Sequence, residues 1–396
     1  MSQSLTDTAP KDFSGGLSGL WYNRRVRGWL YQALLVLGVT GVGLYFFSNA
    51  VTNIARRGLE LGFAFLGRPA NFAIGESILP YAPQDTYGWA LLVGAGNTLL
   101  IALIGCVVTT ILGIVLGVLR LSSNPFVSRA VGLYVELGRN IPLLLQLFFW
   151  YSLITSLAGP RQAYAPVPGV FLSNRGLRIP SLTANDALLY GFVGLLAAGA
   201  VIVGINVYGR RRQAATGQRP HTLGWSLAAV VLLPILGVLA SGDTLSVSVP
   251  RLAGFNFSGG MELSPELFAL LLGLILYTTA FVTEIVRSGI QAISKGQWEA
   301  GRALGLPNGR IMRLIVLPQA LRVMIPPLTS QYLNLTKNSS LAVAIGYPDL
   351  VSVASTTINQ TGQALEIIFI FMAIYLVFSL AISAAMNLLN ASIMSR

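Results

Sequence analysis

Two short helices joined at a sharp corner are encoded by the segment Ser294-Lys-Gly-Gln-Trp-Glu-Ala-Gly-Arg-Ala-Leu-Gly305 and by its continuation, Leu306-Pro-Asn-Gly-Arg-Ile-Met-Arg-Leu-Ile-Val-Leu-Pro318. Ser294 precedes Gln297 by three residues, which predicts a capping box at the start of the first helix. Gly305 stands where a left-handed residue would end that helix, and Pro307 prevents the helix from continuing. We therefore expect one helix to end near Gly305 and another to begin soon after it.

The second helix of this corner is predicted to be amphipathic. Ile311, Leu314 and Ile315 recur at helical spacing, and Arg310 and Arg313 lie opposite them. One side of this helix should therefore rest on the protein while the other faces water.

The first helix of the corner is polar. Glu299 and Arg302 are three residues apart, so they are neighbours on its exposed side. A polar, well-capped helix held outside the membrane is suited to insertion into a groove on a partner protein. The alternative is a pair of interfacial helices that only closes a loop.

The rest of the chain has the composition of a membrane protein. Of its 396 residues, 54% are hydrophobic and only 10% are charged, whereas soluble domains carry about a quarter charged residues. Spans of roughly 20 mostly apolar residues are predicted near 29–50, 91–119, 136–157, 187–208, 224–241, 266–289, 322–345 and 364–390. All should be helices, because an open sheet edge cannot be satisfied in lipid. The first is expected to be a retained anchor, since it has no clear cleavage site.

The charge distribution orients these eight spans. Most of the 26 lysines and arginines fall in segments that alternate with three long stretches, near 51–90, 158–186 and 242–265. The positive-inside rule places both termini in the cytoplasm and these three stretches in the periplasm. The periplasmic stretches are rich in Gly, Pro, Asn and Ser and include Arg56, Arg57, Arg175 and Arg178. They are either docking surfaces or plain connectors.

The corner resembles the EAA loop of ABC importer permeases. The resemblance rests on Glu299-Ala300-Gly301, on Gly305 after it, and on Ile315-x-Leu317-Pro318. Gly301 stands where the second alanine of that motif is usual. The resemblance implies a coupling helix that docks on a separate ATP-binding subunit. The residues that it assigns to coupling are Gln297, Glu299, Ala300, Gly301, Arg302, Gly305, Leu317 and Pro318.

Two further stretches narrow the resemblance to polar amino acid permeases, and in particular to general L-amino acid permeases. They are Arg139-Asn-Ile-Pro-Leu-Leu-Leu-Gln146 and Lys337-Asn-Ser-Ser-Leu341. The implied fold is an all-α type I ABC importer permease with about eight membrane helices, a five-helix core plus three additional ones. The predicted regions are a polar tail (1–28), an extra helix with a periplasmic segment (29–90), the first part of the core (91–157), an insertion with two extra helices (158–265) and the second part of the core (266–396), which carries the coupling loop at 291–318.

A polar stripe within one span is a candidate substrate path. Gln331, Asn334 and Asn338 follow helical spacing with Lys337 beside them, and ionisable groups inside membranes are functional hypotheses by default. A cation with amides would suit an amino-acid carboxylate, but the stripe would equally well hold two subunits together. Gln146 is a further candidate for the path.

Two other pairs within spans have structural interpretations. Glu284 and Arg287, three residues apart, are expected to form a partly wet ion pair near the cytoplasmic end of their span. Gly113 and Gly117 form a small-xxx-small pair that would let two helices approach closely.

Catalytic and metal sites are not predicted. A P-loop needs a Gly-Lys-[Ser/Thr] ending, and Lys11, Lys295 and Lys337 follow Pro, Ser and Thr. One cysteine, Cys106, and one histidine, His221, are too few for a metal site of these ligands. Gly16-Leu-Ser-Gly19 matches an intramembrane serine protease signature, but it lies in the polar tail, where no triad is plausible.

The sequence thus predicts the permease subunit of an ATP-driven importer for polar or general L-amino acids in the bacterial inner membrane. It should bind no cofactor itself, since ATP and Mg²⁺ belong to the partner. The expected partners are two ATP-binding subunits, a second permease, which is expected to be a different but homologous chain, and a periplasmic amino-acid-binding protein. The alternatives are an ion-gradient-driven secondary transporter, which would need no coupling helix, and a membrane scaffold without transport.

Overall fold

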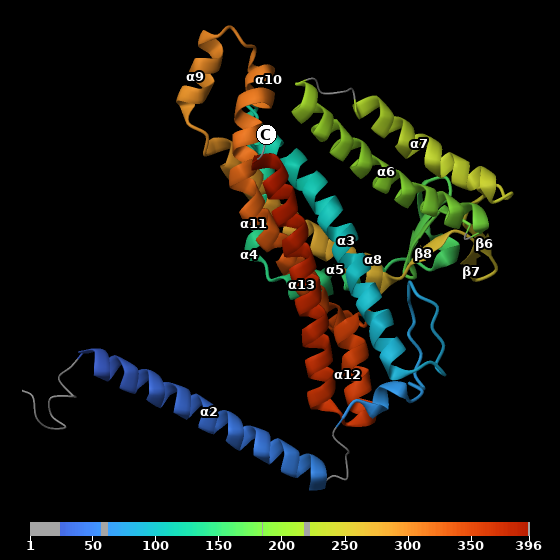
Figure 1. Ribbon diagram of the computed structural model, residues 1–396. Helices are drawn as coiled ribbons and strands as arrows, with labels where there is room; N and C mark the ends of the chain where they lie inside the picture. Colours follow the sequence, from blue (N-terminus) through green and yellow to red (C-terminus); the bar gives the residue numbers. More distant parts are fainter. Residues whose placement is uncertain (1–23, 57–61, 184, 218–221, 395–396) are drawn as a thin grey trace, which may run out of the picture.

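A computed structural model describes residues 24–56, 62–183, 185–217 and 222–394 of the chain. The predictions on Lys11, Arg57, His221 and the stretch 16–19 lie outside these residues. The molecule is mainly helical (Figure 1). Its principal helices are α2 (Arg24–Arg56), α3 (Tyr87–Arg120), α4 (Pro125–Asn140), α5 (Leu143–Thr155), α6 (Asp186–Thr216), α7 (Thr222–Ala240), α8 (Pro265–Gln291), α9 (Lys295–Ala303), α10 (Asn308–Ile311), α11 (Leu317–Asn338), α12 (Leu350–Thr361) and α13 (Ala364–Met394).

The helix boundaries follow local chemistry. Thr86 accepts a hydrogen bond from the Trp89 amide at the start of α3, and Ser264 does the same for Leu267 at the start of α8. Such side chains satisfy amides that have no partner within the helix. Gly362 adopts a left-handed φ of 71° and ends α12.

Seven helices among the described residues are long and apolar enough to cross a membrane, and α5 is apolar but shorter. The prediction of one continuous span over 136–157 is wrong. The chain is broken at Ile141 and Pro142, between α4 and α5, because proline lacks the amide that a continuous helix needs. The short helix α12, between the last two predicted spans, was not predicted from the sequence.

The tightest helix pair in the core is α3 with α8. A Cβ added at Gly113 would lie 2.3 Å from Cγ1 of Val282, and one at Gly117 would lie 2.7 Å from Cβ of Val286. Only glycine therefore permits this approach. The prediction that these two glycines bring helices together is confirmed.

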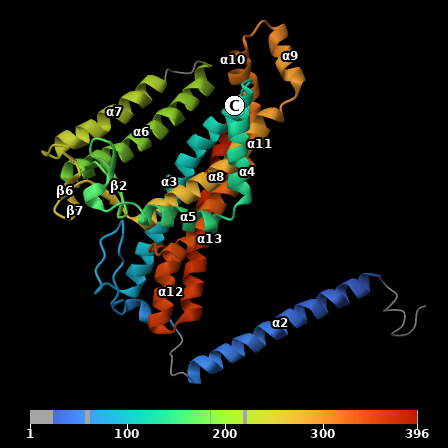
Figure 2. The ribbon, with the colours of Figure 1, turned by 180° about the vertical axis from the view of Figure 1, so that it is seen from behind.

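The predicted five-helix core is formed by α3, the α4–α5 pair, α8, α11 with the following 3₁₀ turn (Ser339–Ile345), and α13. Figures 1 and 2 show α2 separate from this bundle, and its described large apolar side chains are exposed. The helices α6 and α7 form a hairpin beside the bundle. Their backbones meet closely, since a Cβ at Gly194 would lie 2.4 Å from the Leu233 carbonyl oxygen.

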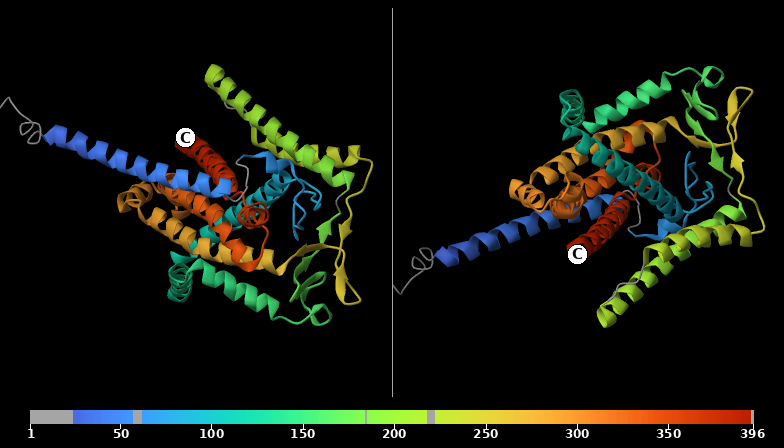
Figure 3. Two further views of the ribbon diagram at one scale, coloured as in Figure 1. Left: turned by 90° about the horizontal axis from the view of Figure 1, so that it is seen from below. Right: turned by 90° about the horizontal axis from the view of Figure 1, so that it is seen from above.

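Short strands, which were not predicted from the sequence, lie in the stretches 158–186 and 242–265. One sheet has the order β1 (Tyr164–Val167), β2 (Val170–Ser173), β3 (Gly176–Ile179) and β8 (Met261–Leu263), and two pairs join β4 (Ser181–Leu182) to β5 (Val247–Ser248) and β6 (Arg251–Ala253) to β7 (Asn256–Ser258). We call residues 160–182 and 247–263 the β platform. It lies at one end of the helices (Figure 3).

Candidate functional site

The corner formed by α9 and α10 protrudes from one end of the molecule (Figures 1 and 2). Gly305 has a φ of +68°, as predicted. The amide of Leu306 donates to the Gly301 carbonyl at 3.1 Å, and the amide of Gly305 donates to that of Arg302 at 2.9 Å. This pair of bonds is a Schellman motif, which ends a helix and fixes the direction of the chain that follows.

The start of α9 differs from the prediction. Ser294 occupies the N-cap position, but its side chain makes no capping bond there, so the predicted capping box is wrong. The side chain of Gln297 instead accepts a hydrogen bond from Nε2 of Gln319 at 3.3 Å. Because Gln319 lies on α11, this contact links the protruding helix to the helix that enters the membrane.

Gly301 is buried at the inside of the corner. A Cβ at this position would lie 2.9 Å from Cγ1 of Ile311, whose side chain is 0% exposed. Alanine, the usual residue of the motif, would therefore require Ile311 to shift. Glycine at position 301 and isoleucine at position 311 are complementary in size.

The outer surface of the corner combines charge with one large apolar side chain. Glu299, Ala300 and Arg302 are exposed, and Leu304 is 77% exposed at the tip. No ion pair joins Glu299 to Arg302 among the described residues. These groups are free to contact a partner.

The second helix is only partly amphipathic in the predicted sense. Ile311 is buried, but Leu314 is 62% exposed, so the prediction that both share one buried face is wrong. Residues Met312–Val316 form a π-helical turn, which contains more residues per turn than an α-helix. This turn rotates Leu314 away from the core.

An ion-pair network lies on the helix that leads into the corner. Nη1 of Arg120 on α3 lies 2.9 Å from Oε2 of Glu284 on α8. Glu284 also accepts a bond from Nε of Arg287 at 3.0 Å. The predicted Glu284–Arg287 pair is therefore confirmed, and Arg120 is a second cation that the sequence did not indicate.

The predicted polar stripe lies on α11 and at its end. Asn334 and Lys337 are exposed, while Gln331 and Asn338 are half-buried. No side-chain hydrogen bond or ion pair of these four appears among the described residues. The exposed series Arg322, Pro326, Ser330, Asn334 and Lys337 repeats every three to four residues, which places it along one side of the helix.

Gln146 lies apart from this stripe. Its Nε2 donates to the carbonyl oxygens of Gly138 at 3.2 Å and Ile141 at 3.0 Å. These carbonyls belong to the break between α4 and α5, so the amide supports the break. Its role in a substrate path stays a prediction.

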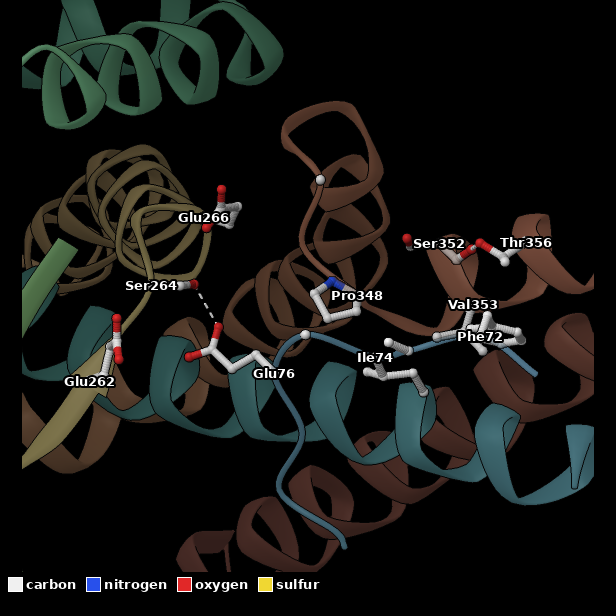
Figure 4. A pocket seen from close by; sticks show the side chains of 13 residues that line it. Phe72, Ile74, Glu76, Glu262, Ser264, Glu266, Pro348, Ser352, Val353 and Thr356 are labelled. Atoms are coloured by element: carbon white, nitrogen blue, oxygen red, sulfur yellow. Dashed lines mark hydrogen bonds between the residues drawn. The ribbon is translucent and has the colours of Figure 1, made fainter. Parts of the chain in front are cut away.

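A cavity of about 590 Å³ opens at the start of α8 (Figure 4). Glu76, Glu262 and Glu266 lie toward one end, and Ser352 and Thr356 toward the other. Oγ of Ser264 donates to Glu76 at 2.6 Å. Burial raises the pKa of the Glu76 carboxyl, although the bond from Ser264 opposes this effect. Three of the lining residues carry carboxyl groups and none is basic, so the cavity is negatively charged where these groups are ionised.

A buried polar turn holds one wall of this cavity. Nδ2 of Asn97 donates to the carbonyl oxygens of Glu76 at 2.8 Å and Pro348 at 2.9 Å. Asp349 is 0% exposed and caps α12 by accepting a bond from the Ser352 amide at 2.8 Å. Burial raises the pKa of Asp349 to about 7.

Comparison with known proteins agrees with the family that the sequence of the α9–α10 corner resembles. The family model described as "Binding-protein-dependent transport system inner membrane component" matches residues 109–395. The chain belongs to this family.

Three relatives of the permease cover nearly its whole length. It is 49% identical to the putative amino-acid ABC transporter permease protein YhdX of Escherichia coli, covering 94% of this chain and 95% of the relative. It is 42% identical to the general L-amino acid transport system permease protein AapQ of Rhizobium johnstonii, covering 99% and 98%. It is 40% identical to the glutamate/glutamine/aspartate/asparagine transport system permease protein BztB of Rhodobacter capsulatus, covering 95% and 96%.

Several site residues of the permease carried no signal in the sequence. Glu76 and Glu262 lie in stretches interpreted only as docking surfaces or connectors, and Asn97 and Asp349 are ordinary polar residues in their local context. Arg120 ends an apolar run and reads only as an orienting charge. Asp349 contacts the Ser352 amide three residues on, but the other four acquire their contacts from segments distant in sequence, so spacing alone does not identify them.

Proposed function

We propose that this permease forms the translocation path of an ATP-driven importer for polar L-amino acids. The observation that carries the proposal is the α9–α10 corner, which presents a rigidly ended polar helix with Leu304 at its tip. Such a knob is suited to the groove of a partner. The ATP-binding subunit would fill that role, since the chain itself has no P-loop lysine.

The substrate class rests on the relatives and on the polar side of α11. All three relatives above carry amino-acid transport in their names. Lys337 and Asn334 are exposed within a membrane-spanning helix, where a lone cation is costly unless it faces a partner or a wet path. An amino-acid carboxylate would be a suitable ligand there.

The expected assembly contains a second permease, two ATP-binding subunits and a periplasmic amino-acid-binding protein, with both termini of this chain in the cytoplasm. ATP and Mg²⁺ are held by the partner ATPase. Closure of the ATPase would move the corner and switch the path between inward and outward access. Transport then follows from the different stability of the two states.

Uptake in proteoliposomes tests this function. The complete complex, with ATP inside and radiolabelled glutamate or glutamine outside, should accumulate label only when ATP and the binding protein are both present. Ionophores that dissipate ion gradients should leave uptake unchanged. ATP-independent uptake that collapses with the ion gradient would establish the secondary-transporter alternative. The purified chain alone should hydrolyse no ATP.

A further inference from the structure

The β platform, which lies outside the five-helix core, has an excess of positive charge. It contains four arginines and one carboxylate. Arg178 pairs with Glu262, which leaves Arg161, Arg175 and Arg251 exposed and without a carboxylate partner in the described chain. The free charge of the platform is therefore all of one sign.

Arg161 is held in place beside an exposed aromatic ring. Its guanidinium carbon lies 3.8 Å from the centroid of the Phe255 ring, and its Nε donates to the Gly254 carbonyl at 3.4 Å. Phe255 is 73% exposed and Tyr164, on the edge strand β1, is 67% exposed. Arginine with exposed aromatic side chains is the composition of protein-interface hot spots.

The platform is also rigid enough to act as a docking surface. The rings of Phe171 and Phe257 stack with centroids 4.6 Å apart, which joins β2 to β7. Antiparallel pairing of β3 with β8 joins its two segments, which are far apart in sequence. Preformed side chains lose less conformational entropy when a partner binds.

The platform lies where a soluble partner would reach it. It is bounded by the end of α5, the start of α6, the end of α7 and the start of α8. It lies at the edge of the helix bundle (Figures 1 and 3), and the α9–α10 corner lies elsewhere. Its arginines are distributed over three separate turns and strands rather than around one phosphate-sized pocket.

We propose that the β platform is the docking surface for the binding protein of the importer, and that it receives an acidic face of that protein. The inference rests on the proposed function. The neighbouring cavity with Glu76 and Glu266 has the opposite charge. An acidic face would be attracted by the platform and repelled by the cavity, and this contrast would fix the orientation of docking.

Stimulation of ATP hydrolysis by the binding protein tests this surface. The probe is the amino-acid-binding protein encoded beside the permease, titrated onto the complete complex in nanodiscs. Arg161→Glu combined with Arg251→Glu should raise the concentration needed for half-maximal stimulation about tenfold and weaken its dependence on salt. Hydrolysis without the binding protein should be unchanged. Arg212→Glu is the matched control, because Arg212 is exposed near the opposite end of α6.

Lysines that replace acidic residues on the binding protein should restore stimulation of the Arg161→Glu, Arg251→Glu double variant. Such a restoration would identify the two contacting faces. An unchanged half-maximal concentration in the double variant would overturn the platform as the docking surface. A shift that follows the anionic lipid content of the nanodiscs, and disappears in neutral lipid, would assign the arginines to lipid headgroups instead. A wild-type complex that shows no stimulation would remove the proposed function itself, and this inference with it.

Discussion

The α9–α10 corner and the polar side of α11 differ in how their properties arise. The turn of the corner is local: Gly305, Gly301 and Ile311 lie within eleven residues, and their contacts are made inside the described chain. The polar side of α11 is periodic in sequence, but Lys337 and Asn334 are exposed and make no side-chain hydrogen bond or ion pair within the described part of the chain. The corner is therefore complete within the chain, whereas the polar side of α11 is proposed to contact a substrate or a second subunit.

The largest effect is expected at the turn of the corner. Gly305→Val places a β-branched residue in a left-handed conformation, which costs about 1–2 kcal/mol, and misdirects α9. The variant should reach the membrane normally yet lose transport and ATPase binding in uptake and pull-down assays. Gly309→Val is the matched control, since Gly309 also faces open space but has no left-handed φ. Wild-type uptake by Gly305→Val would refute the coupling assignment.

Charge reversal on the same helix should have a similar but smaller effect. Glu299 is exposed on α9, so Glu299→Lys changes the docking surface without altering the turn. We expect strongly reduced uptake and substrate-stimulated ATP hydrolysis at normal membrane levels. Glu299→Gln should retain more activity than Glu299→Lys if charge is what the partner recognises. Equal loss in both variants would count against an electrostatic contact.

Lys337→Met tests the polar side of α11. Removal of the cation should reduce uptake several-fold while the complex remains assembled in gel filtration, and Lys337→Arg should keep most of the uptake. If Lys337→Met dissociates the complex instead, the residue holds subunits together. If it transports normally, Lys337 does not border the path.

A smaller effect is expected from Gly301→Ala. The added Cβ would press on Ile311 at 2.9 Å, and overpacking of this kind costs about 1–3 kcal/mol. Coupling should weaken partially in the ATPase assay, and Ile311→Ala in the same chain, which removes the three Ile311 atoms nearest to the added Cβ, should restore it. Gly296→Ala, in open space on the same helix, should have no effect. Failure of the rescue would show that size complementarity is not the cause.

The smallest effect concerns pH. The pKa of Asp349 is raised to about 7 in the folded chain and is about 3.9 when unfolded. The folded state therefore retains a proton that the unfolded state releases, and stability should decrease as pH rises from about 4 to 7. Asp349→Asn keeps a capping side chain and should flatten this part of the melting profile, while Asp243→Asn should not. An unchanged slope would contradict the assignment.

Much of the fold was predictable because the bilayer imposes strong rules. Apolar length located the spans, and Gly113 with Gly117 indicated the close α3–α8 contact. The break at Pro142 was missed because the apolar run continues through it, and the exposure of Leu314 was missed because a π-helical turn leaves no clear sequence signal. The strands were missed because they are only two to four residues long, and because β3 with β8 and β4 with β5 pair across the inserted helices.

The same division applies to the site. Local chemistry predicted Gly305 correctly, whereas Ser294 looked like a capping residue and does not act as one. The bond from Arg120 to Glu284 and the bond from Ser264 to Glu76 join segments far apart along the chain. Sequence spacing does not encode such distances, so these contacts required the structure.

The pairing of β4 with β5 places Leu182 directly opposite Val247. The chain thus leaves the β platform after Leu182 and returns to it at the facing residue Val247, with α6 and α7 between these two points. Because the two ends of the α6–α7 segment lie side by side, a single genetic event can insert or remove the segment without changing the path of the chain through the helix bundle. Evolution can therefore change what surrounds the translocation path while leaving its five helices untouched.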